Sequence, residues 1–232
     1  TITLGTTTTT YDAEGAVVAT GDASGVTEAM VREALNAFVG EISQTPPAYS
    51  AVKVDGQRAY RMARKGQPVT LKARPVRVYR IEVLRFEPPA VEVEVECAKG
   101  TYIRSLANDL GQALGCGAHL SALRRTHVGP FTVEDALTRD DLEKAFGDGT
   151  WTESVLPMDY GLLHLPAITL HIEDEKDLRH GQALQIDEER LVSVGALTPG
   201  LVCRAYAEDG SLVAIITFDA ASGMWKPRKV FS

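Results

Sequence analysis

The most constraining feature of the sequence is a change of hydrophobic period around residue 100. Between Val91 and Cys97, apolar residues alternate with Glu, which predicts a strand with one buried and one solvated face. From Ile103 to Leu114 the apolar residues recur at helical spacing, and Gly115 is a plausible stop. Residues 99–102 are therefore the junction between a strand and a helix.

Arg104 falls in the first turn of that predicted helix, where the helix dipole disfavours a cation. An arginine in such a position either pairs with a carboxylate or phosphate, or points into water. The position alone leaves both interpretations open.

The composition limits the class of protein. With 44% hydrophobic residues in 232, the chain can bury one sizeable core and a second small one. It has no apolar run of about 18 residues and no signal peptide, so we expect no membrane association. Three cysteines without metal-type clustering favour a reduced, cytoplasmic setting, and five scattered histidines predict no metal site.

Positive charge is concentrated in one segment of an otherwise acidic chain. The net charge is −7, but residues 53–85 contain ten Lys or Arg and only two acids, Asp55 and Glu82, for a local charge of +8. Such a block favours a polyanionic partner, although a solvated face is the commoner origin of a charge run.

Up to about residue 160, hydrophobic periodicity predicts a mixture of strands and helices. Besides the central helix, we expect helices at residues 28–39, 59–65, 119–123 and 139–146, the first and last capped by Thr27 and Thr138. From about Leu163, short strands punctuated by glycines predict a small, barrel-like all-β unit.

Three blocks of residues carry a family resemblance. They are Leu4–Gly5 with Thr10–Gly15; Pro46–Gly56 followed by Ala59–Tyr60 and Ala63–Gly66; and Lys99–Arg104 with Asp109–Gly111 and Leu123–Arg125. In their order and spacing these blocks resemble the TruB family of tRNA pseudouridine synthases. Each block alone is a moderate signal, and the three together are a strong one.

The resemblance implies a fold and a domain organisation. Residues 1–160 would form an N-terminally incomplete catalytic domain of the pseudouridine synthase fold, with an RNA-gripping insertion at about 46–85. That fold is an α+β fold with a mixed, mainly antiparallel sheet and flanking helices. Residues 161–232 would form a PUA-type RNA-binding barrel. The implied reaction flips uridine 55 out of the T loop of tRNA, detaches uracil from C1′ and rejoins it through C5, with an Asp nucleophile and no cofactor.

The resemblance also implies roles for individual residues. Arg104 matches the arginine that pairs with the nucleophilic carboxylate, and Tyr102 and Leu123 match positions that wall the uracil pocket. Without the resemblance, Tyr102 and Leu123 would be interpreted as core residues. RNA contacts are expected from basic residues of the insertion and the last block, namely Lys53, Arg58, Arg61, Arg64, Lys65, Arg74, Lys99, Arg124 and Arg125.

The sequence departs from the family pattern in one respect. The family's nucleophile lies in a Gly-x-Leu-Asp block before the first matched block, and the 232 residues contain no such block. We expect the nucleophile upstream of Thr1 and no activity from these residues alone. Asp12 is interpreted as a turn residue and Asp109 as a helix acid, and neither is assigned as a substitute.

The expected partner is the T-arm of tRNA, bound by a cytoplasmic monomer that needs no protein partner. A protein of another class is the alternative, namely a non-catalytic tRNA-binding or tRNA-folding protein that keeps the basic surface.

Overall fold

A computed structural model describes residues 1–54, 56–191 and 194–231, so Asp55 of the second sequence block lies outside the described residues. The chain divides into two compact units, Thr1–Arg124 (unit 1) and Arg125–Ser232 (unit 2). The predicted domain boundary at residue 160 does not coincide with this division, and it stays a prediction.

Unit 1 is built on a five-stranded sheet in the order β4-β7-β8-β1-β9, in which every neighbouring pair is antiparallel. Its strands are β1 (Ile2–Leu4), β4 (Gly40–Gln44), β7 (Arg74–Glu87), β8 (Ala90–Cys97) and β9 (Ala118–Leu120). The mainly antiparallel sheet of an α+β fold is therefore confirmed. The helix expected at 119–123 is wrong, because His119 and Leu120 pair with β1 as strand β9.

The long strand β7 carries two irregularities that explain its sequence pattern. The register against β8 shifts between Val78 and Arg80 and again between Val83 and Arg85. Each shift inserts one residue into the alternation, so Val78 and Val83 are both buried although they are five residues apart. A strict period of two could not assign one buried face to this strand from the sequence.

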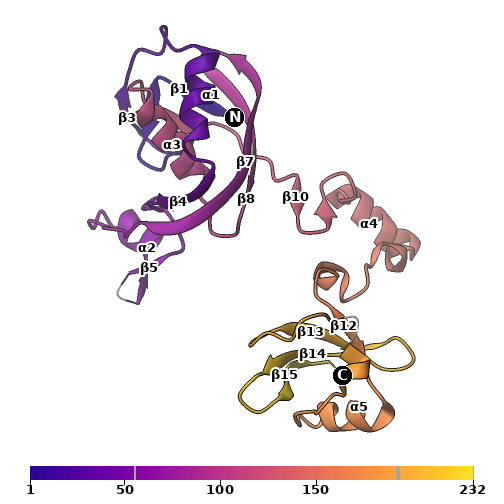
Figure 1. The fold of residues 1–232 in the computed structure, drawn as a ribbon. Helices are drawn as coiled ribbons and strands as arrows, with labels where there is room; N and C mark the ends of the chain where they lie inside the picture. Colours follow the sequence, from indigo (N-terminus) through magenta and orange to yellow (C-terminus); the bar gives the residue numbers. More distant parts are fainter. Residues whose placement is uncertain (55, 192–193, 232) are drawn as a thin grey trace. The chain divides into compact units, whose positions relative to one another are not determined.

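Helices α1 (Glu28–Asn36) and α3 (Ile103–Ala113) share one hydrophobic core with the sheet. Val31 and Leu35 of α1 and Leu110 of α3 pack with Ile2 and Val91 of the strands, and Figure 1 shows α1 lying against the curved β7–β8 pair. Sequence analysis predicts both helices, since Thr27 caps α1 through its side chain and Gly115, at φ +73°, follows the end of α3.

The first part of the basic segment, from Lys53 to Lys65, forms a small appendage of unit 1, whereas its last part belongs to β7. Strands β5 (Lys53–Val54) and β6 (Gln57–Arg58) make a hairpin that leads directly into helix α2 (Ala59–Arg64). The expected short basic helix is confirmed, and Gly66 follows it at φ +68°. A second hairpin joins β2 (Thr6–Thr8) to β3 (Val17–Thr20).

Unit 2 begins with a segment that contributes no residue to its core. The segment contains β10 (His127–Val128), β11 (Phe131–Thr132), α4 (Arg139–Asp148) and 3₁₀ helices at Trp151–Ser154 and Tyr160–Leu162. Thr138 caps α4 with a complete capping box, as the sequence predicts.

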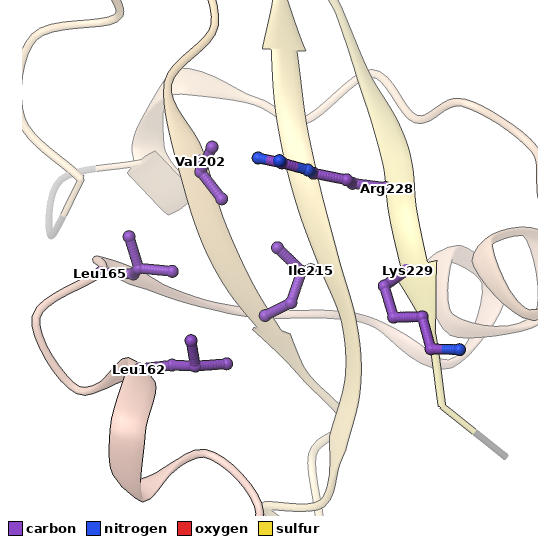
Figure 2. Close-up of a pocket in the computed structure, with 6 residues that line it drawn as sticks. All are labelled: Leu162, Leu165, Val202, Ile215, Arg228 and Lys229. Carbon is purple, nitrogen blue, oxygen red and sulfur yellow. The ribbon is translucent and has the colours of Figure 1, made fainter. Parts of the chain in front are cut away.

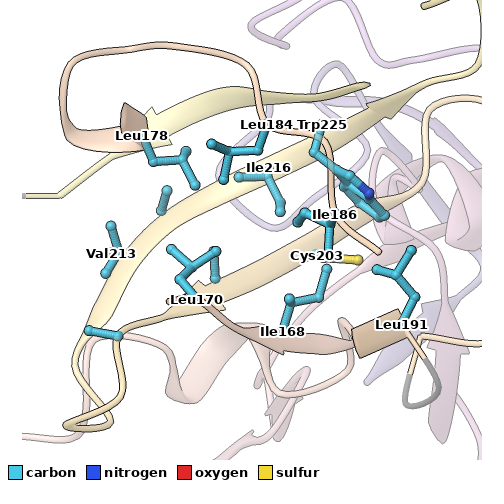
Figure 3. Packing of buried hydrophobic residues seen from close by; sticks show 13 residues of the cluster. Ile168, Leu170, Leu178, Leu184, Ile186, Leu191, Cys203, Val213, Ile216 and Trp225 are labelled. Carbon is cyan, nitrogen blue, oxygen red and sulfur yellow. The ribbon is translucent and has the colours of Figure 1, made fainter. Parts of the chain in front are cut away.

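The core of unit 2 lies on one face of a four-stranded sheet in the order β12-β13-β14-β15. Figure 3 shows Trp225, Cys203 and Ile216 among the side chains that fill this core. The sheet comprises β12 (Ala167–Thr169), β13 (Val202–Tyr206), β14 (Leu212–Asp219) and β15 (Met224–Val230), with β12 and β13 parallel.

The expectation of an all-β unit is wrong in one element. Residues Ile172–Arg179 form helix α5, whose Leu178 is fully buried in the core, and a further 3₁₀ helix spans Glu188–Leu191. The helix begins with three acids, which suit its N-terminal dipole, but it carries few apolar residues that would reveal helical spacing. The PUA-type barrel stays a prediction.

Candidate functional site

The strand-to-helix junction is the centre of the candidate site. Gly100 adopts φ +90°, which turns the chain after β8, and Tyr102 is the extended N-cap residue of α3. Arg104 is the second residue of α3 and is directed at oxygen atoms of two distant segments. The junction predicted from the change of period is therefore confirmed.

The first of these segments is the turn at residues 8–15. Thr8 donates its hydroxyl to the Asp12 carbonyl at 2.6 Å, while the Asp12 carboxylate accepts from the Thr10 hydroxyl and the Glu14 backbone N–H. Tyr11 has φ +62°, a conformation that side chains rarely adopt. Gly15 packs so closely that an added Cβ would lie 2.7 Å from the Thr10 nitrogen, so the turn requires glycine there.

Arg104 binds this turn through an ion pair. Its Nη1 lies 3.0 Å from Asp12 Oδ2 and 3.4 Å from the Thr10 carbonyl oxygen. The two side chains are 26% and 21% exposed, so the pair is shielded from water more than a typical surface salt bridge. The structure thus decides the open question about Arg104: it pairs with a carboxylate.

The second segment is the loop at residues 45–50. Arg104 Nη2 donates to the Tyr49 carbonyl at 2.9 Å, and the Ser105 hydroxyl donates to the Thr45 carbonyl at 2.8 Å. Gln44, at the end of β4, bonds both the N–H and the carbonyl of Tyr102. The first turn of α3 is therefore held by two segments that lie far from it in sequence.

Asp12, Gln44 and Ser105 are members of the site that sequence reasoning missed. Asp12 is a turn residue as expected, yet it also holds Arg104 from 92 residues away. The Pro46–Gly56 block was recognised, but Gln44 lies just before it. The turn chemistry of Asp12 accounted for that residue locally, and no local pattern reports a long-range ion pair.

The predicted pocket walls differ in their environment. Tyr102 is partly buried at the junction, beside Arg104. Leu123 follows β9 and is 64% exposed, and its assignment to a pocket wall stays a prediction.

The predicted RNA contacts are all exposed, whereas two other arginines of the basic segment form ion pairs with glutamates. Arg80 pairs with Glu82 and Glu94, and Arg85 pairs with Glu87. No such pair involves Arg61 or Arg64 among the described residues; instead both guanidinium groups lie within 6 Å of the Tyr60 ring, at 5.9 and 5.6 Å. Helix α2 and its hairpin, which carries Lys53 and Arg58, therefore present positive charge that has no ion pair with a described residue. The same holds for the exposed cations Lys65, Arg74, Lys99, Arg124 and Arg125.

The surroundings of Tyr60 and Asp109 shift the pKa values of both groups. Hydrogen bonding from Arg61 lowers the pKa of the Tyr60 hydroxyl. Burial raises the pKa of Asp109 on α3, opposed by a hydrogen bond from Asn108. Asp109 has no ion pair with a described residue, in contrast to Asp12.

Unit 2 contains a separate shallow depression of about 390 Å³ (Figure 2). Leu162, Leu165, Val202 and Ile215 supply apolar surface, and Figure 2 shows the Arg228 guanidinium extending over it, whereas the nitrogen of Lys229 points away. It contains no acid or nucleophile, so we assign no catalytic chemistry to it.

Neither a membrane span nor a metal centre is found among the described residues. Their helices are too short or too polar to cross a membrane, and no cluster of three His, Cys, Asp or Glu could hold a metal ion.

Comparison with known families decides the relationship of the chain. Residues 1–103 match the N-terminal domain of the TruB family pseudouridylate synthases, and residues 104–163 match the C-terminal domain of tRNA pseudouridylate synthase B. The chain belongs to the TruB family. The junction, Asp12 and the loop at 45–50 all lie within these matched regions.

Individual relatives carry the name tRNA pseudouridine synthase B. The protein from Pseudomonas aeruginosa (strain UCBPP-PA14) is 45% identical over 188 residues, covering 80% of this chain and 62% of the relative. The protein from Arthrobacter sp. (strain FB24) is 40% identical over 245 residues, covering 100% of this chain and 75% of the relative. The chain thus spans 62% of the length of the Pseudomonas relative.

Solved structures of similar fold include larger assemblies. A chain of a Cbf5–Nop10–Gar1 complex matches with a TM-score of 0.69 at 27% identity, covering 100% of this chain and 65% of that chain. A chain of an H/ACA RNP bound to a substrate RNA containing 2′-deoxyuridine matches with a TM-score of 0.67 at 26% identity, covering 89% and 62%.

Proposed function

We propose that this chain acts in a tRNA pseudouridine synthase that isomerises uridine 55 in the T loop of tRNA. The proposal rests on the guanidinium of Arg104, which its hydrogen bonds to Asp12 and Tyr49 fix in place. Arg104 ends the Lys99–Arg104 block, which lies at the strand-to-helix junction. The synthase class is supported by the TruB membership, and the choice of uridine 55 rests on the family resemblance.

Arg104 retains N–H groups that can donate to a further carboxylate. A guanidinium has five N–H groups, and Asp12, Thr10 and Tyr49 use those on Nη1 and one on Nη2. The Nε–H and one Nη2 hydrogen have no acceptor among the described residues, so Arg104 can donate to one more carboxylate. In the proposal this carboxylate is the nucleophilic aspartate, which the Arg104 charge keeps ionised and oriented.

Asp12 is better suited to holding Arg104 than to attacking the substrate. Its Oδ2 accepts from Arg104, and its Oδ1 accepts from both Thr10 and Glu14. These hydrogen bonds hold the Asp12 carboxylate against its own turn and against Arg104, which suits a residue that fixes the position of the guanidinium. We therefore assign Asp12 to positioning and keep the nucleophile as a different aspartate, of the Gly-x-Leu-Asp type.

The substrate side of the proposal follows from the chemistry of a flipped base. A uracil outside the helical stack needs flat apolar walls and a few backbone polar groups. Tyr102 and Leu123 are the proposed walls, and the exposed cations of α2 and its hairpin are the proposed contacts to the T-arm phosphates. The proposal involves no cofactor, because the isomerisation has no net redox change.

A label at C5 of the target uridine tests the reaction directly. Rejoining uracil through C5 displaces the hydrogen there, so a T-loop hairpin tritiated at C5 should release tritium to water during a single turnover. The assay should use both these 232 residues and the complete product of the gene that encodes them. Binding without any release would support a non-catalytic tRNA-binding protein, and neither binding nor release would contradict both functions.

A further inference from the structure

Gln44 makes a pair of hydrogen bonds that joins the edge of the sheet to the start of α3. Its side chain is 2% exposed, at the last position of the edge strand β4. Oε1 accepts from the Tyr102 N–H at 2.8 Å, and Nε2 donates to the Tyr102 carbonyl at 3.1 Å. Because one partner can only donate and the other can only accept, the orientation of the amide is fixed.

Tyr102 depends on these bonds because its own side chain cannot fix the helix start. It is the N-cap of α3, but a tyrosine does not cap backbone N–H groups as Ser or Asp would, and no such bond is formed. Its carbonyl also accepts from the Leu106 N–H at 3.1 Å, the first bond of the helix. Gln44 therefore holds the residue from which the orientation of α3 is set.

We propose that Gln44 is a positioning residue of the site. Its amide fixes the backbone of Tyr102 and, through the first turn of α3, the direction of the Arg104 guanidinium. Ser105, which bonds the Thr45 carbonyl one residue after Gln44, reinforces the same connection. The consequence for catalysis rests on the proposed function, whereas the clamp itself can be tested without it.

The proposal predicts a pH-dependent defect for Gln44→Glu. The ionised carboxylate still accepts from the Tyr102 N–H but faces the Tyr102 carbonyl without a hydrogen to donate. Burial raises the pKa of the introduced carboxyl above its usual value of about 4.3. The positive charges on the two elements that position 44 contacts, Arg74 of β7 and Arg104 of α3, oppose this rise. The protonated form restores both bonds. The defect should therefore be present at high pH and disappear as the pH falls.

Hydrogen exchange of the Tyr102 amide, followed by NMR, measures the clamp. In Gln44→Glu its protection factor should fall about tenfold or more near pH 8 and return towards the parent value near pH 5. Gln44→Met, which keeps the volume and removes both bonds, should lose protection at both pH values. Gln112→Glu, an exposed substitution on the same helix, is the matched control and should change neither.

Other results would overturn the clamp. Unchanged Tyr102 protection in Gln44→Glu near pH 8 would do so, as would unchanged protection in Gln44→Met at both pH values.

A second measurement addresses catalysis in the complete gene product. Gln44→Glu should lower turnover of a saturating T-loop hairpin about tenfold near pH 8, with RNA affinity unchanged and turnover recovering at lower pH. If the parent forms no pseudouridine, the proposed function fails, and the exchange data still decide the clamp. If the parent is active and the variant equally so, Gln44 does not position the site.

Discussion

Arg104 and the arginines of α2 differ in what surrounds their guanidinium groups. Arg104 is partly buried and donates to a carboxylate and two carbonyls from separate segments. Arg61 and Arg64 are exposed, lie near the Tyr60 ring and have no ion pair with a described residue. Both regions belong to unit 1, so the difference arises from local surroundings rather than from different domains.

The difference indicates two uses of positive charge. A partly buried arginine must be compensated for lost hydration, and its fixed partners leave it in one orientation. Exposed arginines keep their water and their rotamer freedom, so they can follow a phosphate backbone without a fixed geometry. We therefore expect substitutions at the junction to affect turnover and substitutions on α2 to affect binding.

The largest effect is expected for Arg104→Lys in the complete gene product. Lysine offers a point charge on a flexible stem and cannot hold Asp12, Tyr49 and a further carboxylate together. Turnover of a T-loop hairpin at saturating enzyme should be slower, because about 2–4 kcal/mol of transition-state stabilisation is lost. The affinity for the hairpin should change little. Arg139→Lys, an exposed arginine on α4, is the control. Turnover within roughly threefold of the parent would make the junction a structural element only.

A smaller effect is expected for Asp12→Asn. The amide keeps an acceptor for Arg104 but removes the negative charge, so the loss is the difference between a charged and a neutral hydrogen bond, about 1–2 kcal/mol. Single-turnover rates should fall about tenfold with unchanged RNA affinity. Glu14→Gln, in the same turn and exposed, should have no effect. A complete loss of turnover in Asp12→Asn, equal to that of removing the nucleophile, would instead indicate that Asp12 attacks the substrate.

Substitutions on α2 test the other half of the comparison. Neutralising Arg61 and Arg64 with Gln should weaken hairpin binding about tenfold and reduce the slope of log K against log salt by roughly 1.5–2, from an expected parent value of about −3 to −5. Turnover at saturating RNA should be unchanged. Neutralising Arg80 and Arg85, which already pair with glutamates, is the matched control and should reduce the slope less.

An unchanged slope after neutralising Arg61 and Arg64 would place the RNA elsewhere. The exposed cations at the depression of unit 2, Arg228 and Lys229, would then be the next residues to neutralise.

The sequence predicts elements well where local signals agree. The change of period marks β8 and α3, and Thr27 and Thr138 mark the starts of α1 and α4 because capping is a contact within three residues. It fails for α5, whose residues are mostly charged, and for β9, where three residues pair with a strand more than a hundred positions away.

The same distinction separates the predicted and the missed parts of the site. The position of Arg104 at a helix N-terminus indicates either an anionic partner or a solvated side chain, and the family resemblance assigns it to the site. Asp12 and Gln44 were not identified, because each satisfies local rules by itself, as a turn residue and as a strand end. Their contacts with α3 span 92 and 58 residues, and only the folded chain brings them together.

The smallest effect concerns Asp109, a carboxylate on α3 that lacks the cation Asp12 has. Burial raises its pKa, so its folded-state pKa lies above the unfolded value, and its stabilising contribution is lost as the pH rises through the folded pKa. Asp109→Asn keeps an acceptor for the Asn108 amide and removes this titration. Urea unfolding should show the variant to be more stable than the parent near neutral pH, by less than about 1 kcal/mol because the group is partly solvated. The difference should vanish below about pH 4, where both the folded and the unfolded state of the parent are protonated at Asp109.

Glu33→Gln, an exposed acid on α1, is the control and should show no such gain. A variant less stable than the parent at neutral pH would mean that the ionised Asp109 has a favourable partner, and the contrast with Asp12 would not hold.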